Sequence, residues 1–487
     1  MKLLGASLLG TVFGDEVCYR HNQCEVGCFT NLPPWGGTDA RPGSKLPNLP
    51  SDLNVNFHLD TTLETGVNID YGNFDSLAAS SFNPENPVYF IIHGYFDTGD
   101  EGWLQRISAL ILEQENANVF RVDWGEGSRT IQYAQAATDT QVVGGSVGCL
   151  IKDMEPFFRS MNSMVSKITC IGHSLGAQAC GYVGQNVQKR YGVKLPVIHG
   201  LDPAEPYFKD TPDEVCLGYS DADFVSVIHS DATQFLSGGV QGLGLSYPVG
   251  HVDFWPNNGT NHPGCEGGLF DQITDNGGIW EGLRDFAVCY HQRAIRFFEE
   301  SIPRNCNYKS YKCKRWTDFY EGYCLESWDN NLLPEMGWNS IHYKDIMPKP
   351  NLNEVYLNTG DKKPFCVHEN LQRLYFNANT DRNLELDLEI QYLHSSGSPI
   401  TLKINESPIT PYEGFQMRTP LTLKENLGSI NSLWVKLDFA GGLINLSHYA
   451  TIDRIYIKHG EVQEESIYCP LEASMKVGQT YIFEKCQ

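Results

Sequence analysis

The sequence predicts two domains of different classes, a mostly parallel sheet with flanking helices followed by an antiparallel β-sandwich. The first prediction rests on short apolar runs that alternate with longer helical stretches from about residue 87 to residue 300, as in a parallel sheet covered on both faces. The second rests on segments after about residue 353 in which apolar and polar residues alternate with a period near two, as in antiparallel strands with one buried face. A chain of 487 residues is also too long for one ordinary core.

The elements of the first half follow from the hydrophobic runs and their lengths. Short runs rich in β-branched residues predict strands, whereas longer stretches predict helices. The predicted strands span residues 88–92, 119–123, 168–171, 197–201 and 224–228. The predicted helices span residues 142–161 and 176–191.

The second half contains strictly alternating segments that are separated by Asn, Gly, Ser and Pro. The predicted strands, in a sandwich of roughly eight, include residues 384–390, 401–404, 433–437 and 451–458. Residues 303–353 join the two halves and are rich in polar, aromatic and cysteine residues. We therefore expect a first domain over residues 15–352 and a second over residues 353–487.

The N-terminus and the composition predict a secreted, extracellular protein. A short apolar run that ends in small residues fits a signal peptide over residues 1–14. No later apolar run reaches the roughly 18 to 20 residues that span a bilayer, so no transmembrane segment is expected. Asn258, Asn405 and Asn445 begin Asn-x-Ser/Thr sequons, which fit a glycoprotein. The net charge of −23 argues against nucleic acid as a partner and predicts that any lipid contact is mainly apolar.

The fifteen cysteines divide into groups by their surroundings. Cys149, Cys170 and Cys180 lie in apolar strand or helix patterns and are expected to be free core thiols. No pair of cysteines is spaced as in a structural zinc site. Several cysteines in polar, loop-like sequence suit disulfides in an oxidising compartment, namely Cys18, Cys24, Cys28, Cys306, Cys313, Cys324, Cys469 and Cys486.

The strongest chemical signal is the pentapeptide Gly172-His-Ser-Leu-Gly176, which matches G-x-S-x-G. It follows a predicted strand and opens a helix rich in small residues. Glycines permit the tight strand-to-helix turn that projects a serine hydroxyl, and the helix N-terminus offers N–H groups to developing negative charge. This context predicts Ser174 as the nucleophile of a serine hydrolase with the α/β hydrolase fold.

A nucleophilic serine needs a base, and the base needs an orienting carboxylate. In this fold class the order along the chain is Ser, then Asp or Glu, then His. Asp202 directly follows the next predicted strand, at the sheet edge where ligands bind, and is the candidate acid. Four histidines follow in the first half of the chain, and their distance from Asp202 in the sequence does not indicate which one is the base. They are His229, His251, His262 and His291.

An oxyanion hole needs backbone donors placed beside the nucleophile. The N–H of Leu175, directly after Ser174, is one candidate. The predicted strand 88–92 runs into a His-Gly turn, which is the kind of turn that supplies a second donor. That donor would be the N–H of Tyr95.

Together these motifs resemble the pancreatic lipase family. The matching blocks occur in the family's order and spacing, and the resemblance covers nearly the whole chain. It implies a second domain of the PLAT/C2-like β-sandwich type. The blocks are Phe90-Ile-Ile-His-Gly-Tyr95, Asp123-Trp124, Gly127-Ser-Arg-Thr130, Ile171-Gly-His-Ser-Leu-Gly-Ala177, Gly200-Leu-Asp-Pro-Ala-Glu-Pro206, Gly250-His-Val-Asp-Phe254, Gly278-Ile-Trp-Glu-Gly282, Arg284-Asp-Phe-Ala287 and Cys289-Tyr-His291.

The resemblance implies roles that the residues alone leave open. It implies His291 as the base, Asp202 as the acid, and Leu175 and Tyr95 as the backbone oxyanion donors. Phenylalanine is usual in the family at the position of Tyr95. The disulfides that it implies are Cys18–Cys28, Cys265–Cys289, Cys313–Cys324 and Cys469–Cys486, whereas Cys24, Cys306 and Cys366 stay unassigned.

The resemblance also implies a lid of full length, closed by a disulfide, over residues 265–289. In a closed state its apolar side chains would cover the site, and at an oil surface they would turn toward lipid. These side chains are Leu269, Phe270, Ile273, Ile279 and Trp280.

A structural calcium loop is implied over residues 211–223. Asp213 and Asp221 match ligand carboxylates of the family, and Cys216 falls on a backbone carbonyl ligand. Gly218 stands where a third carboxylate is expected. Calcium takes six to eight oxygen ligands, so this loss weakens the predicted site.

The expected function is hydrolysis of carboxyl esters of glycerolipids, most of all triacylglycerols, with no cofactor required for the chemistry. The alternatives are a phospholipase A1 or galactolipase with the same triad, and an inactive lipid-binding homologue. A full-length lid argues against the first, because shortened lids accompany phospholipid or galactolipid preference in relatives, and an intact triad argues against the second. The predicted partners are a lipid substrate and the lipid–water interface. A colipase-like activator is not carried over, because the strand-loop residues of the second domain do not match the family clearly.

Overall fold

The fold was analysed in a computed structural model, in which two compact units comprise Met1–Ser310 with Pro334–Phe365 and Tyr311–Leu333 with Cys366–Gln487. Most of the predicted signal peptide and the whole interior of the predicted lid lie outside the described residues. The residues that the structure describes are 11–13, 16–233, 242–265, 289–305, 307–325, 333–346, 353–377, 380–381, 384–394, 398–405, 407–424, 430–440, 448–460 and 464–486.

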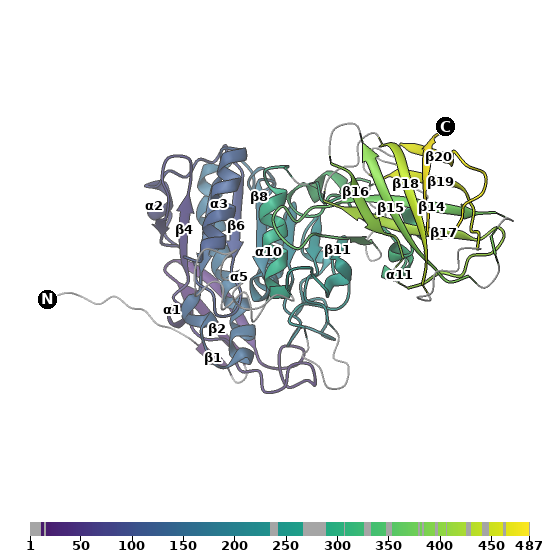
Figure 1. The fold of residues 1–487 in the computed structure, drawn as a ribbon. Coiled ribbons are helices and arrows are strands. Elements are labelled where there is room, and N and C mark those ends of the chain that lie inside the picture. Colours follow the sequence, from purple (N-terminus) through teal and green to yellow (C-terminus); the bar gives the residue numbers. More distant parts are fainter. Residues whose placement is uncertain are drawn as a thin grey trace. The chain divides into compact units, whose positions relative to one another are not determined.

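A mostly parallel sheet forms the centre of the first unit (Figure 1). Neighbouring strands from β13 to β7 pair in parallel, and β4 and β5 add an antiparallel edge. The five predicted strands are all present, each within two residues of its predicted ends. Across the sheet the order is β13 (Glu354–Leu357), β11 (Val252–Pro256), β10 (Val225–Ile228), β9 (Val197–Leu201), β8 (Ile168–His173), β6 (Val88–Ile92), β7 (Asn118–Asp123), β4 (Asn56–Asp60) and β5 (Val67–Ile69).

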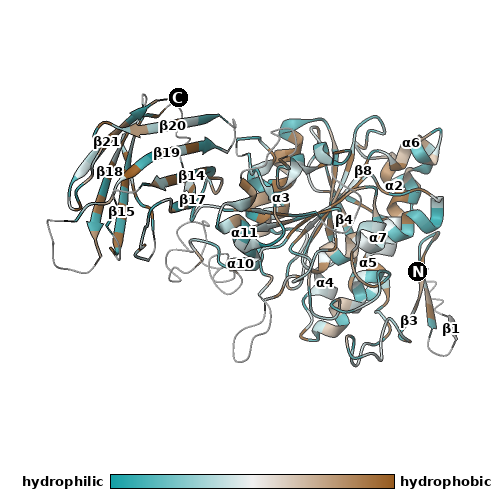
Figure 2. Cartoon of the chain, turned by 90° about the vertical axis from the view of Figure 1, so that its right-hand side faces the viewer, coloured by the Kyte–Doolittle hydropathy of each residue, from teal (hydrophilic) through white to brown (hydrophobic). Residues whose placement is uncertain are grey.

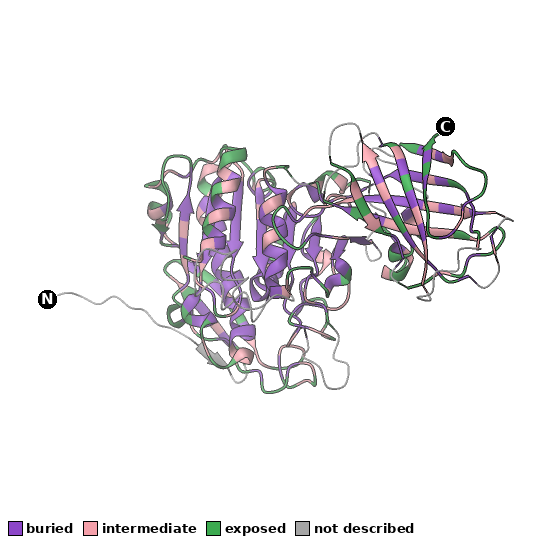
Figure 3. Ribbon diagram, viewed as in Figure 1, coloured by how far each residue is buried: buried purple, intermediate pink, exposed green. Residues whose placement is uncertain are grey.

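Helices cover both faces of this sheet, with α3 and α10 on one face and α5 and α7 on the other (Figure 1). The central strands are buried along nearly their whole length (Figure 3), which explains why they are continuous apolar runs rather than alternating ones. The long helices are α3 (Gly102–Gln114), α5 (Tyr133–Met154), α7 (Leu175–Tyr191) and α10 (Cys289–Ser301). The short helices and 3₁₀ turns of this unit are α1 (Pro50–Leu53), α2 (Phe74–Ala78), α4 (Gly125–Ser128), α6 (Met161–Val165), η1 (Glu155–Phe157), η2 (Tyr219–Asp221), η3 (Asn257–Gly259) and η6 (Trp338–Tyr343).

The helix predicted over residues 142–161 differs from the observed α5 at both ends. It begins at Tyr133, because the polar and alanine-rich turns before residue 142 continue the helix and bury Ala136 and Ala137. It ends at Met154, two residues before Pro156, which has no N–H for a helical bond and disfavours helix in the residue before it.

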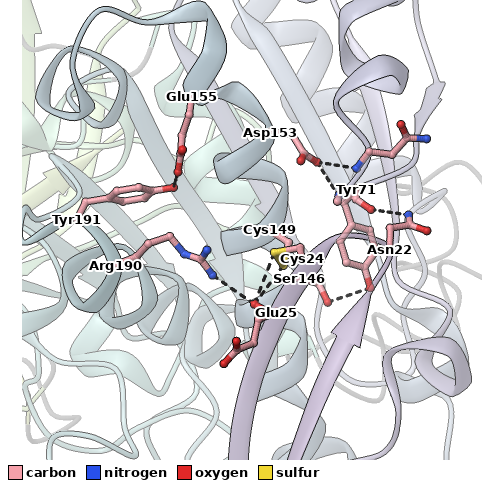
Figure 4. The surroundings of a disulfide bond; sticks show 12 residues. Asn22, Cys24, Glu25, Tyr71, Ser146, Cys149, Asp153, Glu155, Arg190 and Tyr191 are labelled. Carbon is pink, nitrogen blue, oxygen red and sulfur yellow. Dashed lines mark hydrogen bonds between the residues drawn. A yellow bond between two sulfur atoms is a disulfide. The ribbon is translucent and has the colours of Figure 1, made fainter. Parts of the chain in front are cut away.

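A small antiparallel sheet near the N-terminus is tied to α5 by a disulfide. It consists of β1 (Thr11–Phe13), β2 (Glu16–His21) and β3 (Cys24–Thr30). The bond between Cys24 and Cys149 joins the start of β3 to the C-terminal half of α5 (Figure 4). Beside it the hydroxyl of Ser146 donates to the Tyr71 hydroxyl at 3.3 Å, and the Arg190 guanidinium donates to the Glu25 carbonyl at 3.3 Å.

The prediction of free core thiols at Cys149, Cys170 and Cys180 is wrong. Cys149 pairs with Cys24, and Cys170 of β8 pairs with Cys180 of α7. The turn at residue 174 folds α7 back along β8, so that the Cα atoms of Cys170 and Cys180 lie 5.8 Å apart, within the range that a disulfide needs. The apolar surroundings predicted burial correctly but did not indicate pairing. Among the cysteines that the structure describes, Cys216 is free and buried.

The four disulfides expected from the family resemblance are present. They join Cys18 to Cys28, Cys265 to Cys289, Cys313 to Cys324 and Cys469 to Cys486. Cys366, which had no assigned partner, is also disulfide-bonded. Cys306 lies outside the described part of the chain.

The second unit is built on eight antiparallel strands around a core of its own. Alternate residues of β15 and β18 are buried (Figure 3), as the period of two predicts. It also contains β12 (Tyr311–Lys312), α11 (Trp316–Tyr320) and η4 (Tyr323–Leu325). The sheet order is β16 (Ile400–Lys403), β15 (Leu386–His394), β18 (Ile430–Phe439), β21 (Thr480–Lys485), β20 (Glu465–Pro470), β19 (Ile452–His459), β14 (His368–Phe376) and β17 (Gln416–Leu423).

Brown, apolar stretches alternate with teal ones along these strands, whereas the central strands of the first unit are brown over longer runs (Figure 2). The predicted fold class, an α/β hydrolase sheet followed by an antiparallel β-domain, is confirmed.

The division observed between the units differs from the boundary expected at residues 352 and 353. Residues 353–365 belong to the first unit, because β13 pairs in parallel with β11, and residues 311–333 belong to the second.

One predicted glycosylation sequon is part of the interior of the second unit. Asn405 is buried, and its amide nitrogen donates to the carbonyls of Leu386 at 3.0 Å and Ser407 at 2.8 Å. Its amide oxygen accepts the N–H of Leu388 at 2.7 Å. A glycan would break these bonds, so the structure argues against modification there. Asn258 is exposed, and Asn445 lies outside the described residues.

Candidate active site

Ser174 occupies a sharp turn between the end of β8 and the start of α7. Its φ of 57° and ψ of −122° lie in a region that non-glycine residues rarely adopt. The flanking glycines permit this turn. A Cβ at Gly172 would lie 2.2 Å from the carbonyl oxygen of Gly176, and a Cβ at Gly176 would lie 2.1 Å from the carbonyl oxygen of Ile92. The two glycines of G-x-S-x-G are therefore required by close backbone packing.

The turn that carries Ser174 is bonded to the loop that carries Asp202. The N–H of Ser174 donates to the Leu201 carbonyl at 3.0 Å, and the Ser174 carbonyl accepts the N–H of Ala204 at 3.3 Å. Asp202 itself has a positive φ of 46°. These backbone bonds hold the predicted acid beside the predicted nucleophile at the carboxyl edge of the sheet.

Asp202 and His291 form a buried hydrogen-bonded pair. The Nδ1 of His291, near the start of α10, lies 2.6 Å from Oδ2 of Asp202. The other carboxylate oxygen accepts the N–H groups of Ser230 at 2.7 Å and Asp231 at 3.1 Å. Gly244 packs against this carboxylate so closely that a Cβ there would lie 2.2 Å from Oδ1. The acid is therefore fixed from several sides.

The four candidate histidines have different partners. The ring of His229 lies 2.8 Å from Asp253, the ring of His262 lies 2.8 Å from the Ser230 carbonyl, and His251 accepts the N–H of Val225 at 3.0 Å. Of the four, the structure brings His291 to Asp202. The ring of His173, directly before Ser174, lies 4.6 Å from the His291 ring, and its Nε2 lies 3.1 Å from the His291 carbonyl.

The pKa of His291 lies above its ordinary value. Burial of the ring lowers it, but the hydrogen bond and negative charge of Asp202 raise it further than burial lowers it, with smaller contributions from Asp231 and Asp97. This is the environment of a base that gains a proton during a reaction, since the imidazolium is stabilised by a fixed carboxylate.

Asp231 is a neighbour of this pair that the sequence reasoning did not single out. Its carboxylate, the carboxylate of Asp202 and the imidazole of His291 offer ligating atoms within 4.8 Å of one another. Burial and the charge of Asp202 raise the pKa of Asp231. Asp231 follows β10 by a few residues, so the rule that located Asp202 at the carboxyl end of a strand also applied to it.

Of the two predicted oxyanion donors, Leu175 directly follows Ser174, and Tyr95 follows a glycine that packs against Ser174. Leu175 is the first residue of α7, and Gly94, directly before Tyr95, approaches Ser174 so closely that a Cβ there would lie 2.7 Å from the Ser174 Cβ. No hydrogen bond within the described part of the chain uses the N–H of Tyr95 or of Leu175. The Tyr95 hydroxyl donates to the Thr130 carbonyl at 2.5 Å, which fixes the loop after β6.

The model of the family described as Lipase matches residues 16–365. The pancreatic triacylglycerol lipase of Cavia porcellus is 40% identical over 362 residues, which are 73% of this chain and 74% of that protein. The chain belongs to the pancreatic lipase family. The human pancreatic triacylglycerol lipase is 38% identical over 370 residues, 74% of each chain. A relative called inactive pancreatic lipase-related protein 1, from Mus musculus, is 34% identical over 471 residues, 96% of this chain and 94% of that protein.

In the loop that resembles the calcium loop of the pancreatic lipase family, the two matching aspartates differ in burial and in their partners. Asp221 is buried, and its oxygens accept the Gln185 amide at 3.1 Å and the N–H of Gly218 at 2.9 Å. Asp213 is exposed. Cys216 turns a buried thiol toward the Tyr247 hydroxyl at 3.8 Å. Protein donors thus already bond both oxygens of the one buried carboxylate, and Gly218 supplies no third carboxylate to the loop.

The predicted lid begins and ends at a disulfide beside the site. The Cα atoms of Cys265 and Cys289 lie 5.7 Å apart, and Cys289 is the first residue of α10, two residues before His291. Leu269, Phe270, Ile273, Ile279 and Trp280 lie outside the described residues. No described helix is both long enough and apolar enough to cross a bilayer.

Proposed function

We propose that this chain is a secreted carboxyl-ester hydrolase that acts on triacylglycerols, with Ser174, His291 and Asp202 as its catalytic triad. The observation that carries the proposal is the buried bond of 2.6 Å between His291 and Asp202. The strained turn of Ser174 adjoins this pair, since the Ser174 carbonyl accepts the N–H of Ala204 and the ring of His173 lies 3.1 Å from the His291 carbonyl. Strained backbone of this kind costs free energy and is concentrated at functional sites. The names of the pancreatic triacylglycerol lipases support the substrate class.

In the proposed mechanism the Ser174 hydroxyl attacks the ester carbonyl while neutral His291 accepts its proton. Asp202 keeps the proton on Nδ1 of His291, so that the other ring nitrogen is the base, and its charge stabilises the imidazolium. The N–H groups of Tyr95 and Leu175 bind the oxyanion. His291 then protonates the leaving alcohol, and water, activated by His291, releases the fatty acid from Ser174.

We also propose that residues 265–289 act as the lid of this site. The disulfide fixes both ends of the segment, and its second end leads directly into the helix turn that carries His291. Apolar side chains inside the segment would exchange contact with the site for contact with an oil surface, which supplies the differential affinity that opening needs. The partner is thus the lipid–water interface.

Two further parts of the proposal concern the compartment and calcium. Six disulfides among the described residues favour a secreted protein, since such bonds persist in oxidising compartments.

Because the donors at residues 211–223 do not fit calcium, we infer that this loop holds its shape through the bonds of Asp221. Thermal unfolding in calcium and in EDTA should give equal midpoints, and a higher midpoint in calcium would contradict this.

The triad is tested by replacing the nucleophile. Ser174→Ala should lower hydrolysis of emulsified triolein by at least about a thousandfold, whereas Ser163→Ala, at an exposed position on α6, should leave it unchanged. Labelling of Ser174 by an organophosphate separates this reading from an inactive homologue. Unchanged hydrolysis by Ser174→Ala would refute the triad. Faster hydrolysis of phosphatidylcholine or galactolipid than of triolein would refute the substrate class and leave the triad standing.

A further inference from the structure

A disulfide spans the turn that carries Ser174. Cys170 lies on β8 before Ser174, and Cys180 lies on α7 after it. The bond holds the two Cα atoms 5.8 Å apart over a sequence separation of 10, whereas ten extended residues span about 33 Å. It therefore closes a short covalent ring around the proposed nucleophile.

The turn inside this ring has a strained backbone. The φ of 57° and ψ of −122° at Ser174 cost free energy, and such a conformation persists only where the surrounding structure imposes it. The other restraints on the turn are non-covalent. The Ser174 N–H donates to the Leu201 carbonyl at 3.0 Å, and Gly176 packs closely against the carbonyl oxygen of Ile92. The disulfide adds a covalent restraint to the same turn.

The two elements that the disulfide joins differ in how they are held. Cys170 lies in the centre of the sheet, between Phe90 of β6 and Ile198 of β9, so the backbone of β8 is paired on both sides. Helix α7 packs on these strands, and packed helices can slide by small amounts. Because both cysteines are 0% exposed, the bond ties the helix to the strand within the interior.

The position of α7 determines the position of two groups of the proposed mechanism. Leu175, whose N–H is a proposed oxyanion donor, is the first residue of α7, and Ser174 directly precedes it. A sliding helix would move both groups relative to the N–H of Tyr95 and the ring of His291. A displacement of about 1 Å at a catalytic group costs roughly a hundredfold in rate, so a small movement of α7 is enough to affect the reaction.

We propose that the Cys170–Cys180 disulfide is a positioning element of the active site. It holds α7 against β8 and so keeps the Ser174 hydroxyl and the Leu175 N–H in their reactive positions. The two cysteines act through the turn and not on the substrate. The proposal rests on the proposed function, because Ser174 is the group that the disulfide positions.

The hairpin of β2 and β3 provides a matched control. Its disulfide, Cys18–Cys28, has the same sequence separation of 10. In the chain-entropy description, loops of equal length restrict the unfolded chain equally. Loss of either bond should therefore act alike on the unfolded chain, whereas only loss of Cys170–Cys180 frees the turn of Ser174.

The test compares two double variants of the full-length protein on a soluble ester. Cys170→Ala with Cys180→Ala should lower kcat by about tenfold or more and leave KM unchanged, because misplaced groups lose interactions made in the transition state. Cys18→Ala with Cys28→Ala should keep the wild-type kcat. On heating, the first variant should lose activity below the midpoint of its global unfolding, whereas the control should lose both together.

A second variant separates the covalent link from the packing of the sulfur atoms and guards against loss of folding. Cys170→Val with Cys180→Ala refills part of the space with a residue that suits a strand. Its kcat should still fall, because the link is absent. A wild-type kcat in both variants of this pair would overturn the proposal, and so would an equal fall in the control or a rise in KM alone.

Ser174→Ala, measured in the same assay, distinguishes this proposal from the proposed function. Hydrolysis that survives in Ser174→Ala would refute the triad. An inactive Ser174→Ala beside fully active variants of Cys170 and Cys180 would refute the positioning role and leave the triad standing.

Discussion

Burial and the carboxylate of Asp202 shift the pKa of His291 in opposite directions, and their balance determines whether His291 can act as a base at a given pH. A buried imidazole alone would resist protonation, whereas the carboxylate at 2.6 Å favours it. A raised pKa makes the neutral ring a stronger base, but it also means that protonation removes the base at a higher pH. The same carboxylate thus determines both the strength of the base and the acid limit of activity.

The pH profile should therefore depend on Asp202. In the wild type, kcat/KM on a soluble ester should fall as the pH drops through the raised pKa of His291, above the ordinary value of about 6.5. Asp202→Asn removes the charge that raises this pKa, so the acid limb should move to lower pH. The plateau rate should fall by about a thousandfold or more, because the imidazolium and its tautomer lose their support. An acid limb at the same pH in both proteins would show that another group titrates.

The close packing of Gly244 against the carboxylate of Asp202 gives a second prediction at the scale of one residue. Gly244→Ala places a Cβ where it would meet Oδ1 of Asp202 at 2.2 Å, so the carboxylate or its loop must shift. A displacement of about 1 Å at a catalytic group costs roughly a hundredfold in rate, and kcat/KM should fall by about that factor. Gly218→Ala is the control, because the nearest atom to its added Cβ is 3.8 Å away. Equal activity of the two variants would contradict the prediction.

The sequence indicated Ser174 and Asp202 through local context, because each directly follows a strand that hydrophobic pattern alone predicts. The histidine could not be found in this way. His291 lies near the start of α10, and its approach to Asp202 depends on how α10 packs against the sheet. Only the family resemblance pointed to it. Asp231 was missed although it obeys the same strand-end rule as Asp202.

The hairpin of β2 and β3 is joined to the rest of the first unit by a disulfide between residues far apart in the sequence. The Cys24–Cys149 disulfide closes a loop with a sequence separation of 125, whereas Cys18–Cys28 spans 10 residues within the hairpin. In the chain-entropy description a longer loop restricts the unfolded chain more. Cys24 and Cys149 are also buried, so their removal leaves unfilled space in the interior.

Removal of the long-range disulfide should therefore cost more stability than removal of the local one. Loss of Cys24–Cys149 by alanine at both positions should lower the free energy of unfolding by about 4 kcal/mol or more, against about 3 kcal/mol for Cys18–Cys28. Denaturant unfolding of the two double variants measures the difference. Equal midpoints, or a smaller loss for the buried pair, would contradict the account.

The central strands could be predicted closely because burial on both faces produces uninterrupted apolar runs with sharp ends. The start of α5 was missed, because its first turns are polar and alanine-rich and lack the apolar run that marked the helix. Disulfides between apolar elements, such as Cys170–Cys180, could likewise not be predicted from the sequence. Such a bond forms only where a helix folds back along a strand, and the hydrophobic pattern does not indicate that geometry.

At the scale of the whole molecule, the division into two units does not follow the order of the chain. The composition changes near residue 353, yet β13 lies just beyond that point and completes the sheet of the first unit. In the sequence, β13 is a short apolar segment directly before the alternating strands of the second half, so it resembles one of those strands. Its partner, β11, lies about a hundred residues earlier, and only the assembled sheet reveals the pairing. The family match also ends at residue 365 rather than at residue 352.

Two fragments should therefore differ sharply in stability. A fragment of residues 16–365 keeps β13, whereas one of residues 16–352 exposes the edge of β11 and loses the buried side chains of Val355 and Leu357. Each buried aliphatic side chain contributes about 1.5 to 3 kcal/mol, and an uncovered central strand promotes association. The shorter fragment should unfold at a lower temperature, aggregate more readily and lose hydrolysis of a soluble ester. Both fragments contain residues 311–333, so this difference isolates the contribution of residues 353–365. Equal thermal midpoints would mean that the first unit does not need β13.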